Sequence, residues 1–309
     1  MTPTPDGLTA SVRRRLLDLA TRTGDDPNVI WSRYAVERLL YRLSVSEFAG
    51  EFALKGAVLF AVWSDQPHRP TMDLDLLAFG PDSEERIALI FQAVCDLPVE
   101  PDGLRFDTDS LRIQPIRETA EYQGRRVTLT AWLGKARIPV RVDMGFGDVV
   151  TPATEMVDFP TLLDLPAPRV RACPRQTVVA EKLHALVTLG MANSRMKDFY
   201  DLYVLSDHFT FEGTVLVGAV QATFQRRKTS LPADTPVALT EELFRDAAKQ
   251  AQWAAFTRRL GEKGPPVAFI DVWSRLRLFL LPVLESAAER GPALCHWPAG
   301  GPWQMGGSA

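Results

Sequence analysis

Two aspartates, Asp73 and Asp75, stand two residues apart in the short, otherwise apolar run of residues 72–77. Alternation of apolar and polar residues is typical of a β-strand, so both carboxylates project from one face, roughly 6 to 7 Å apart. Two carboxylates bracketed by leucines are costly to bury unless a cation meets them. Because Mg²⁺ prefers oxygen ligands, this spacing predicts a site for two metal ions bridged by carboxylates.

Residues just before this strand have the types that bind phosphate groups. Gly56 permits close backbone approach to a triphosphate, and the amide groups of Gly56 and Ala57 near a helix N-terminus would point at it. Lys55 either adds positive charge there or lies on the surface. Arg69 could hold phosphate or RNA. Thr71 is predicted to belong to the same nucleotide site. Alternatively, it only satisfies the strand's preference for β-branched residues.

A third carboxylate, Asp143, lies in a predicted strand at residues 138–146. It falls on the face opposite Val140 and Val142, so it can meet the Asp73/Asp75 face from a neighbouring strand. The alternative is a carboxylate in a turn at the strand end.

Two predicted helices carry further candidates. Lys182 lies on an amphipathic helix, where it could be a solvated side chain. Asp198 either orients Lys182 or accepts a substrate proton. Lys197 and Asp201, four residues apart, could form a surface ion pair worth about 0.3 to 0.5 kcal/mol.

The elements that position these residues follow from periodicity. Helical spacing of apolar residues predicts helices at residues 8–23, 27–43, 82–95, 176–189, 195–205, 240–260 and 270–287. Strands are predicted at 71–79, 111–116, 126–132 and 138–146, and residues 51–63 read as a helix or a strand-to-helix turn. The last helix is expected to kink or end near Pro282. Interleaved helices and strands predict an α+β fold with a mixed sheet.

We expect two lobes. Residues 1–148 are expected to form the lobe that holds the mixed sheet and its flanking helices, and 176–291 a helical lobe. A proline-rich connection spans 149–175, and 292–309 form a flexible tail.

Composition narrows the class of protein. The chain has 309 residues, 46% of them hydrophobic, and a formal net charge of −3, which argues against coating nucleic acid by bulk charge. A local basic groove could still come from residues 125–126, 169–171, 175 and 226–228. Three widely spaced cysteines predict buried, reduced thiols and no zinc site. Apolar runs too short to cross a bilayer predict a cytoplasmic protein without a membrane partner.

In this order the motifs resemble those of the AbiEii/AbiGii nucleotidyltransferase-like toxins, a branch of the polymerase β-type nucleotidyltransferase superfamily. The similarity covers about residues 54–202. It rests on Lys-Gly-Ala at 55–57, Arg-Pro-Thr-Met-Asp-Leu-Asp at 69–75, Arg-Val-Asp at 141–143, Ala-Glu-Lys-Leu at 180–183 and Arg-Met-Lys-Asp-Phe-Tyr-Asp at 195–201. Ala57 departs from the Gly or Ser of many members, and the long gap before Asp73 implies an inserted loop near residues 63–70.

The resemblance implies site residues and a function. Asp73, Asp75 and Asp143 would hold two Mg²⁺ ions, and Lys182 and Arg195 would contact the nucleotide. It implies a toxin of a toxin–antitoxin system, active in phage defence. Such a toxin would transfer nucleotides from an NTP to an RNA acceptor, a tRNA 3′ end, and would have a cognate antitoxin protein. Two alternatives stay open: transfer to a small-molecule or protein hydroxyl, and a catalytically idle binding module.

Overall fold

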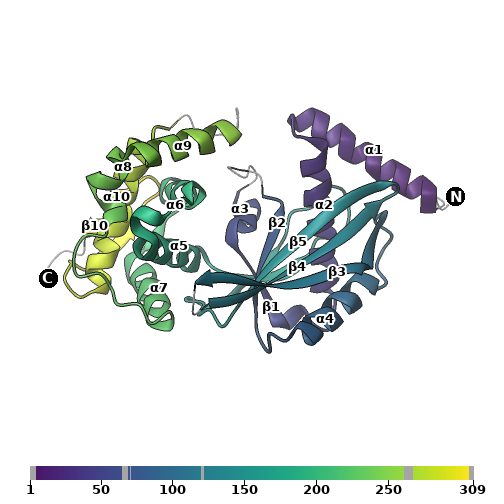
Figure 1. Ribbon diagram of the computed structural model, residues 1–309, viewed down its shortest axis with the longest axis horizontal. Coiled ribbons are helices and arrows are strands. Elements are labelled where there is room, and N and C mark those ends of the chain that lie inside the picture. Colours follow the sequence, from purple (N-terminus) through teal and green to yellow (C-terminus); the bar gives the residue numbers. More distant parts are fainter. Residues whose placement is uncertain (1–4, 65–68, 70, 120–121, 261–266, 306–309) are drawn as a thin grey trace. The chain divides into compact units, whose positions relative to one another are not determined.

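The computed structural model describes residues 5–64, 69, 71–119, 122–260 and 267–305 (Figure 1). The chain divides into two compact units, Met1–Gly147 with Glu155–Ala172, and Asp148–Thr154 with Cys173–Ala309. Within the described ranges, no helix has the length and apolar character that a membrane span requires.

The first unit is built on one seven-stranded mixed sheet. Its strands are β1 (Phe52–Lys55), β2 (Asp73–Ala78), β3 (Leu104–Thr119), β4 (Tyr122–Leu133), β5 (Ala136–Phe146), β6 (Glu155–Asp158) and β7 (Arg169–Ala172). Their order across the sheet is β3-β4-β5-β2-β1-β7-β6. Strands β2 and β5 are parallel, as are β1 and β7, whereas the other neighbours are antiparallel. The Asp-x-Asp strand thus lies inside the sheet.

The two faces of this sheet differ because its strands alternate. On β5 the buried side chains are Ile138, Val140, Val142 and Met144. Helix α2 (Pro27–Ser44) packs against β5, and α4 (Glu84–Asp96) packs against β3 (Figure 1). The residues between the buried ones therefore project from the other face, as period-two alternation requires. Asp143 is one of these outward residues.

The flanking helices begin where the sequence supplies caps. Asp26 accepts a hydrogen bond from the Asn28 amide at the start of α2, with Pro27 at the first helical position. Ser83 caps α4 by accepting from the Arg86 amide. Helix α1 (Pro5–Thr23) packs on α2. Short 3₁₀ turns, η1 (Ala49–Glu51) and η2 (Gly56–Leu59), flank β1, and α3 (Phe60–Trp63) follows.

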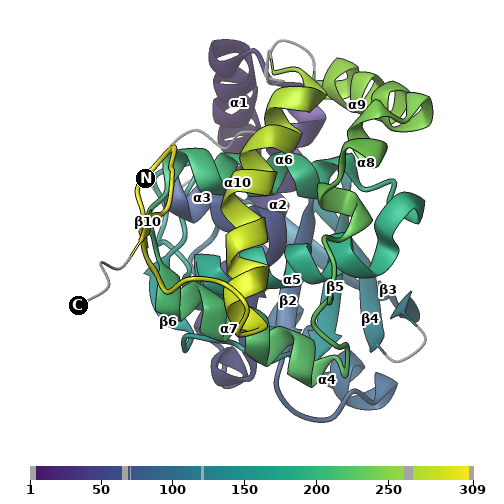
Figure 2. The ribbon, with the colours of Figure 1, turned by 90° about the vertical axis from the view of Figure 1, so that its left-hand side faces the viewer.

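The second unit is helical with a small three-stranded sheet. It contains α5 (Arg175–Leu189), η3 (Gly190–Ala192), α6 (Met196–His208), β8 (Phe211–Glu212), α7 (Gly213–Arg226), η4 (Val237–Leu239), α8 (Glu241–Arg245), α9 (Ala247–Leu260), α10 (Phe269–Ala287), β9 (Leu294–Trp297) and β10 (Gln304–Met305). Helix α10 packs on α6 and α7 (Figure 2). Phe279 of α10 stacks on Trp303, and the buried Trp297 donates its indole N–H to the Ser206 carbonyl oxygen, 2.7 Å away. The final segment is therefore anchored by aromatic packing.

The predicted α+β class and mixed sheet are confirmed, and several boundaries differ. Strand β3 begins at Leu104, well before the predicted 111, and helix α7 was not predicted. The predicted helix 240–260 is two helices, broken at Asp246. Helix α10 continues past Pro282 to Ala287. Cys95 and Cys173 are buried as expected, whereas Cys295 is exposed because it alternates with the buried Leu294 on β9.

The proline-rich segment and the tail also differ from the expected domain map. Residues 149–175 contain β6 and β7, which extend the sheet of the first unit. Prolines at 160, 166 and 168 fall between these strands, where a missing N–H costs no ladder bond. The described part of 292–309 holds β9 and β10 together with two buried tryptophans.

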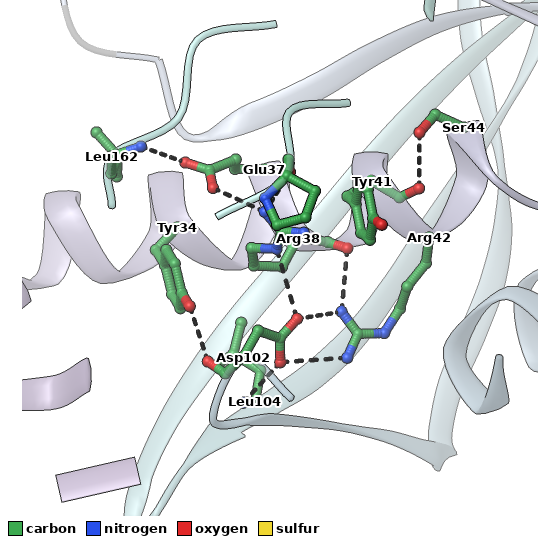
Figure 3. A network of polar contacts seen from close by, with 10 residues as sticks. Tyr34, Glu37, Arg38, Tyr41, Arg42, Ser44, Asp102, Leu104 and Leu162 are labelled. Carbon is green, nitrogen blue, oxygen red and sulfur yellow. Dashed lines mark hydrogen bonds and ion pairs between the residues drawn. The ribbon is translucent and has the colours of Figure 1, made fainter. Parts of the chain in front are cut away.

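A buried polar network ties α2 to two loops of the first unit (Figure 3). Asp102 accepts from both terminal nitrogens of Arg42, at 2.5 and 3.3 Å, and lies 3.5 Å from Nε of Arg38. Arg38 also contacts Glu37 at 3.3 Å, and the Leu162 amide donates to Glu37 at 2.7 Å. The four charged side chains are nearly inaccessible to solvent and formally cancel, so each one depends on its partners.

Removing one partner should therefore be costly. We expect Asp102→Asn to lower the free energy of unfolding by about 3 to 5 kcal/mol, because two buried guanidinium groups lose their carboxylate. Urea unfolding at pH 8 measures this, since burial raises the pKa of Glu37 only to about 7. Asp18→Asn, at an exposed position of α1, should change stability little. Equal stability of the two variants would contradict the role given to the network.

Candidate active site

Parallel pairing of β2 with β5 brings the three predicted carboxylates to one face of the sheet. Asp75 lies opposite Asp143, and Asp73 lies opposite Arg141. Neighbouring strands are about 4.8 Å apart, so the Asp75 and Asp143 side chains start as close neighbours. All three aspartates are partly exposed. Asp143 lies within β5, so the alternative of a carboxylate in a strand-end turn is wrong.

Gly56 lies against the Asp75 side chain. Its φ of +73° is in the region that favours glycine. A Cβ added there would lie 2.7 Å from Cγ and 2.8 Å from Cβ of Asp75, closer than real side chains approach. Glycine is therefore required at this position for the backbone to meet the carboxylate.

Two arginines of the same face pair with the carboxylates. Arg126 of β4 donates from Nε and from a terminal nitrogen to both oxygens of Asp143, each at 2.7 Å. This hydrogen bond raises the pKa of the Arg126 guanidinium above its usual value, and nearby Asp73 and Asp75 add to the effect. Arg141 lies 3.5 Å from Asp73. Within the described ranges, no three His, Cys, Asp or Glu residues converge in a metal-ligating group.

Sequence reasoning missed the roles of both arginines. Arg126 had been grouped with Arg125 as a basic patch, but the two alternate across β4. Arg125 instead lies near Asp82, with its Nε donating to the Asp82 carbonyl oxygen at 3.0 Å. The alternation of residues 137, 139, 141 and 143 is the signal that places Arg141 on the same strand face as Asp143. Which carboxylate each arginine contacts depends on strand register.

The predicted phosphate-binding residues lie on β1, on η2 and just before β2. Lys55 pairs with Asp75 across β1 and β2, so their side chains project from the same face. Ala57 follows Gly56 in η2. The Thr71 hydroxyl lies 3.4 Å from the Asp73 carbonyl oxygen, a local contact at the start of β2. Arg69 is partly exposed, and the rest of the expected inserted loop, residues 65–68 and 70, lies outside the described residues.

A second charged group lies within the helical unit. Lys182 of α5 places Nζ 2.6 Å from Oδ1 of Asp198 and 2.9 Å from Oδ2 of Asp201, both on α6. The Lys182 side chain is 13% exposed and that of Asp201 is 0% exposed. The alternatives of a solvated Lys182 and of a surface pair between Lys197 and Asp201 are wrong, because Asp201 faces α5 and Lys197 faces solvent. Of the two roles weighed for Asp198, this geometry matches orientation of Lys182.

Arg195 begins α6 and is exposed. Its amide donates to Oδ1 of the buried Asn193 at 2.8 Å. The buried Lys249 of α9 donates to the Asn193 carbonyl oxygen at 2.7 Å. These bonds fix the turn that presents Arg195. The assignment of Lys182 and Arg195 to the nucleotide stays a prediction.

His184, two residues beyond Lys182, is packed. Its Nε2 lies 2.9 Å from the Thr229 hydroxyl, and its ring meets Phe224 edge to face. Burial, helped by Arg227, lowers the pKa of His184 to about 4. The imidazole is therefore neutral at physiological pH and adds no charge near Lys182.

A mixed sheet carrying an Asp-x-Asp strand against a glycine turn, with a third aspartate in register beside it, defines a site of the nucleotidyltransferase type. The model of the family described as "Nucleotidyl transferase AbiEii toxin, Type IV TA system" matches residues 38–281. The chain belongs to this family of nucleotidyltransferase toxins from type IV toxin–antitoxin systems. No curated protein sequence matches it.

A solved structure shares the fold. The chain resembles the crystal structure of JHP933 from Helicobacter pylori with a TM-score of 0.50 at 10% identity, over 86% of this chain and 95% of that one. It also resembles a candidate nucleotidyltransferase from H. pylori with a TM-score of 0.49 at 10% identity, over 85% and 98% of the two chains.

Substitution of Gly56 by alanine tests whether the turn beside Asp75 requires glycine. We expect it to cost about 1 to 2 kcal/mol of stability through the positive φ, and to abolish nucleotidyl transfer by displacing Asp75. Gly50→Ala, at a glycine of η1 with open space around it, should leave activity unchanged. Unfolding curves and transfer rates of both variants measure this, and full activity of Gly56→Ala would contradict the close fit.

Lys182→Met should lower the free energy of unfolding by about 3 to 5 kcal/mol, because the buried Asp198 and Asp201 would lose the ammonium group that both contact. Lys197→Met, at an exposed position of the same charge, should change it by less than about 0.5 kcal/mol. Urea titration of the two variants provides the comparison. A larger loss at Lys197 would overturn the pairing described above.

Proposed function

We propose that this chain is a Mg²⁺-dependent toxin that transfers nucleotides from an NTP to an RNA acceptor, a tRNA 3′ end. The observation that carries the proposal is the register of Asp75 with Asp143, beside Asp73 and Gly56. Family membership adds a nucleotide substrate and an antitoxin partner. Such substrates would place the reaction in the cytoplasm, and loss of usable tRNA would block translation during phage defence.

The donor set of this face fits Mg²⁺. Asp73, Asp75 and Asp143 supply hard carboxylate oxygens from adjacent strands, the ligands that Mg²⁺ prefers. They would hold the metal once Asp143 separates from Arg126 and Asp73 separates from Arg141. When bound, Mg²⁺ ions activate a hydroxyl nucleophile and neutralise departing pyrophosphate.

The protein's own residues would position the nucleotide. Gly56 leaves room for a triphosphate beside Asp75, and the amides of Gly56 and Ala57 are donors for phosphate oxygens. Lys55, on the Asp75 face, supplies positive charge without directional demands. Because the attacking hydroxyl belongs to the acceptor, no covalent intermediate with the protein is needed.

Purified protein incubated with total RNA and each labelled NTP tests the proposal. A labelled product of tRNA size supports it. Label only in protein or in a small metabolite would contradict it in favour of those acceptors, and no label with any acceptor would favour an idle binding module.

Asp73→Asn and Asp75→Asn should each reduce transfer on the order of 100-fold or more, because each removes a carboxylate charge that positions the reacting groups. The melting temperature without metal should hold, since the exposed Asp73 to Arg141 contact contributes little. Asp96→Asn, exposed at the end of α4, is the matched control.

Expression of wild type without the neighbouring antitoxin gene should slow growth, and equal inhibition by Asp73→Asn would refute transfer as the cause.

A further inference from the structure

The face of the sheet that carries the three aspartates continues outward over β5, β4 and β3. Register places Arg105, Trp132 and Arg137 side by side in one row across these strands. A second row contains Arg112, Thr128 and Arg141, and it meets Asp73 on β2. Residues directly opposite on paired strands project from the same face. We call Arg105, Arg112, Arg137, Arg141 and Trp132 the arginine face.

The positive charge of this face is largely uncompensated. Arg105, Arg112 and Arg137 are exposed, and in the described part of the chain none has a carboxylate within ion-pair distance. Arg112 donates to the carbonyl oxygens of Asp109 and Leu111, at 2.9 and 2.7 Å, which leaves its charge unneutralised. Exposed guanidinium groups in such rows form a surface for a polyanion.

Trp132 sits between two of these arginines. The Arg105 guanidinium lies 6.0 Å from its ring centroid, and its indole N–H donates to Asp107 at 3.3 Å. The ring is only partly buried. An aromatic ring flanked by cations on an open sheet is a combination that binds single-stranded nucleic acid, because bases stack on rings while arginines meet phosphates.

The arginine face also runs directly into the candidate active site. Arg137 and Asp143 are six positions apart on β5, so the outer row lies about 20 Å from the third carboxylate at ~3.3 Å per residue. Arg141 lies between, beside Asp73. A chain of phosphates on this face would therefore end at the carboxylates.

We propose that the arginine face binds the sugar–phosphate backbone of the RNA acceptor and directs its 3′ end to Asp73, Asp75 and Asp143. This inference rests on the proposed transfer to RNA, and it adds which surface holds the acceptor. Because the arginine face is positively charged, its ligand is a polyanion. Because the face is continuous with the carboxylates, that polyanion is the RNA strand that carries the attacking hydroxyl. Specificity for one RNA would come from other contacts, since phosphate contacts carry no sequence information directly.

The double variant Arg105→Glu/Arg137→Glu tests the proposal. With unfractionated bacterial tRNA as acceptor, its KM for RNA should rise about 10-fold or more, while its KM for NTP and its kcat at saturating RNA stay near those of wild type. The slope of log affinity against log salt should weaken by about 1.5, since two phosphate contacts are lost. Arg14→Glu/Arg22→Glu on α1 carries the same charge change and should leave every value unchanged.

Binding of labelled tRNA without NTP separates this inference from the proposed function. If wild type and Arg105→Glu/Arg137→Glu bind tRNA equally well, the arginine face is not the acceptor surface, whether or not RNA is labelled. If wild type labels no RNA but its tRNA binding requires the face, the surface assignment holds and the transfer proposal fails. If only binding of the neighbouring gene's protein is lost, the face is a protein interface and the inference is overturned.

If the charge reversals impair folding, as a raised KM for NTP would reveal, Arg105→Gln/Arg137→Gln replaces them. Neutralisation should still raise the KM for RNA above that of wild type and weaken the salt dependence, because the same two phosphate contacts are missing. An unchanged KM for RNA in this milder variant, with normal unfolding behaviour, would overturn the proposal.

Discussion

The candidate site depends on the register between the parallel strands β2 and β5. Side chains alternate along each strand, so a slip of one residue would turn Asp143 toward the buried face and Val142 toward Asp75. The apolar residues of both strands prevent this slip, because Leu74, Leu76 and Val142 are buried on the other face. The core of the first unit therefore sets the position of its carboxylates, and the same register arranges the arginines of β3, β4 and β5 in rows.

Charge is handled differently in the core and on the open face. Under α2, two arginines and two carboxylates are sealed from solvent and form ion pairs with one another, which ties α2 to the loops at Asp102 and Leu162. In the helical unit, Lys182 serves two carboxylates of α6 at once. On the open face the pairs are exposed and worth less, since water screens them. The core pairs hold structure, whereas the pairs of the open face are accessible to solvent.

The strand positions of the candidate site residues could be predicted because side-chain alternation is a property of the local sequence. The alternation of residues 72–77 placed Asp73 and Asp75 on one strand face, and the same pattern placed Asp143 opposite its buried valines. Partner choice could not be predicted, because the Arg126 to Asp143 bond follows from strand register and the Lys182 to Asp201 bond from helix packing. Helix α7 escaped notice since Gly213 and Gly218, with several β-branched residues, give it weak helical propensity.

The bidentate bond of Arg126 on Asp143 has a consequence for ion selectivity. A cation that takes these oxygens must first displace a guanidinium, so its apparent affinity is its intrinsic affinity reduced by the strength of that pair. Under the proposed function, a triphosphate would bring oxygens that accept the released guanidinium. Arg126 is thus a resident counterion of Asp143, and under the proposed function its release would accompany the binding of metal and nucleotide.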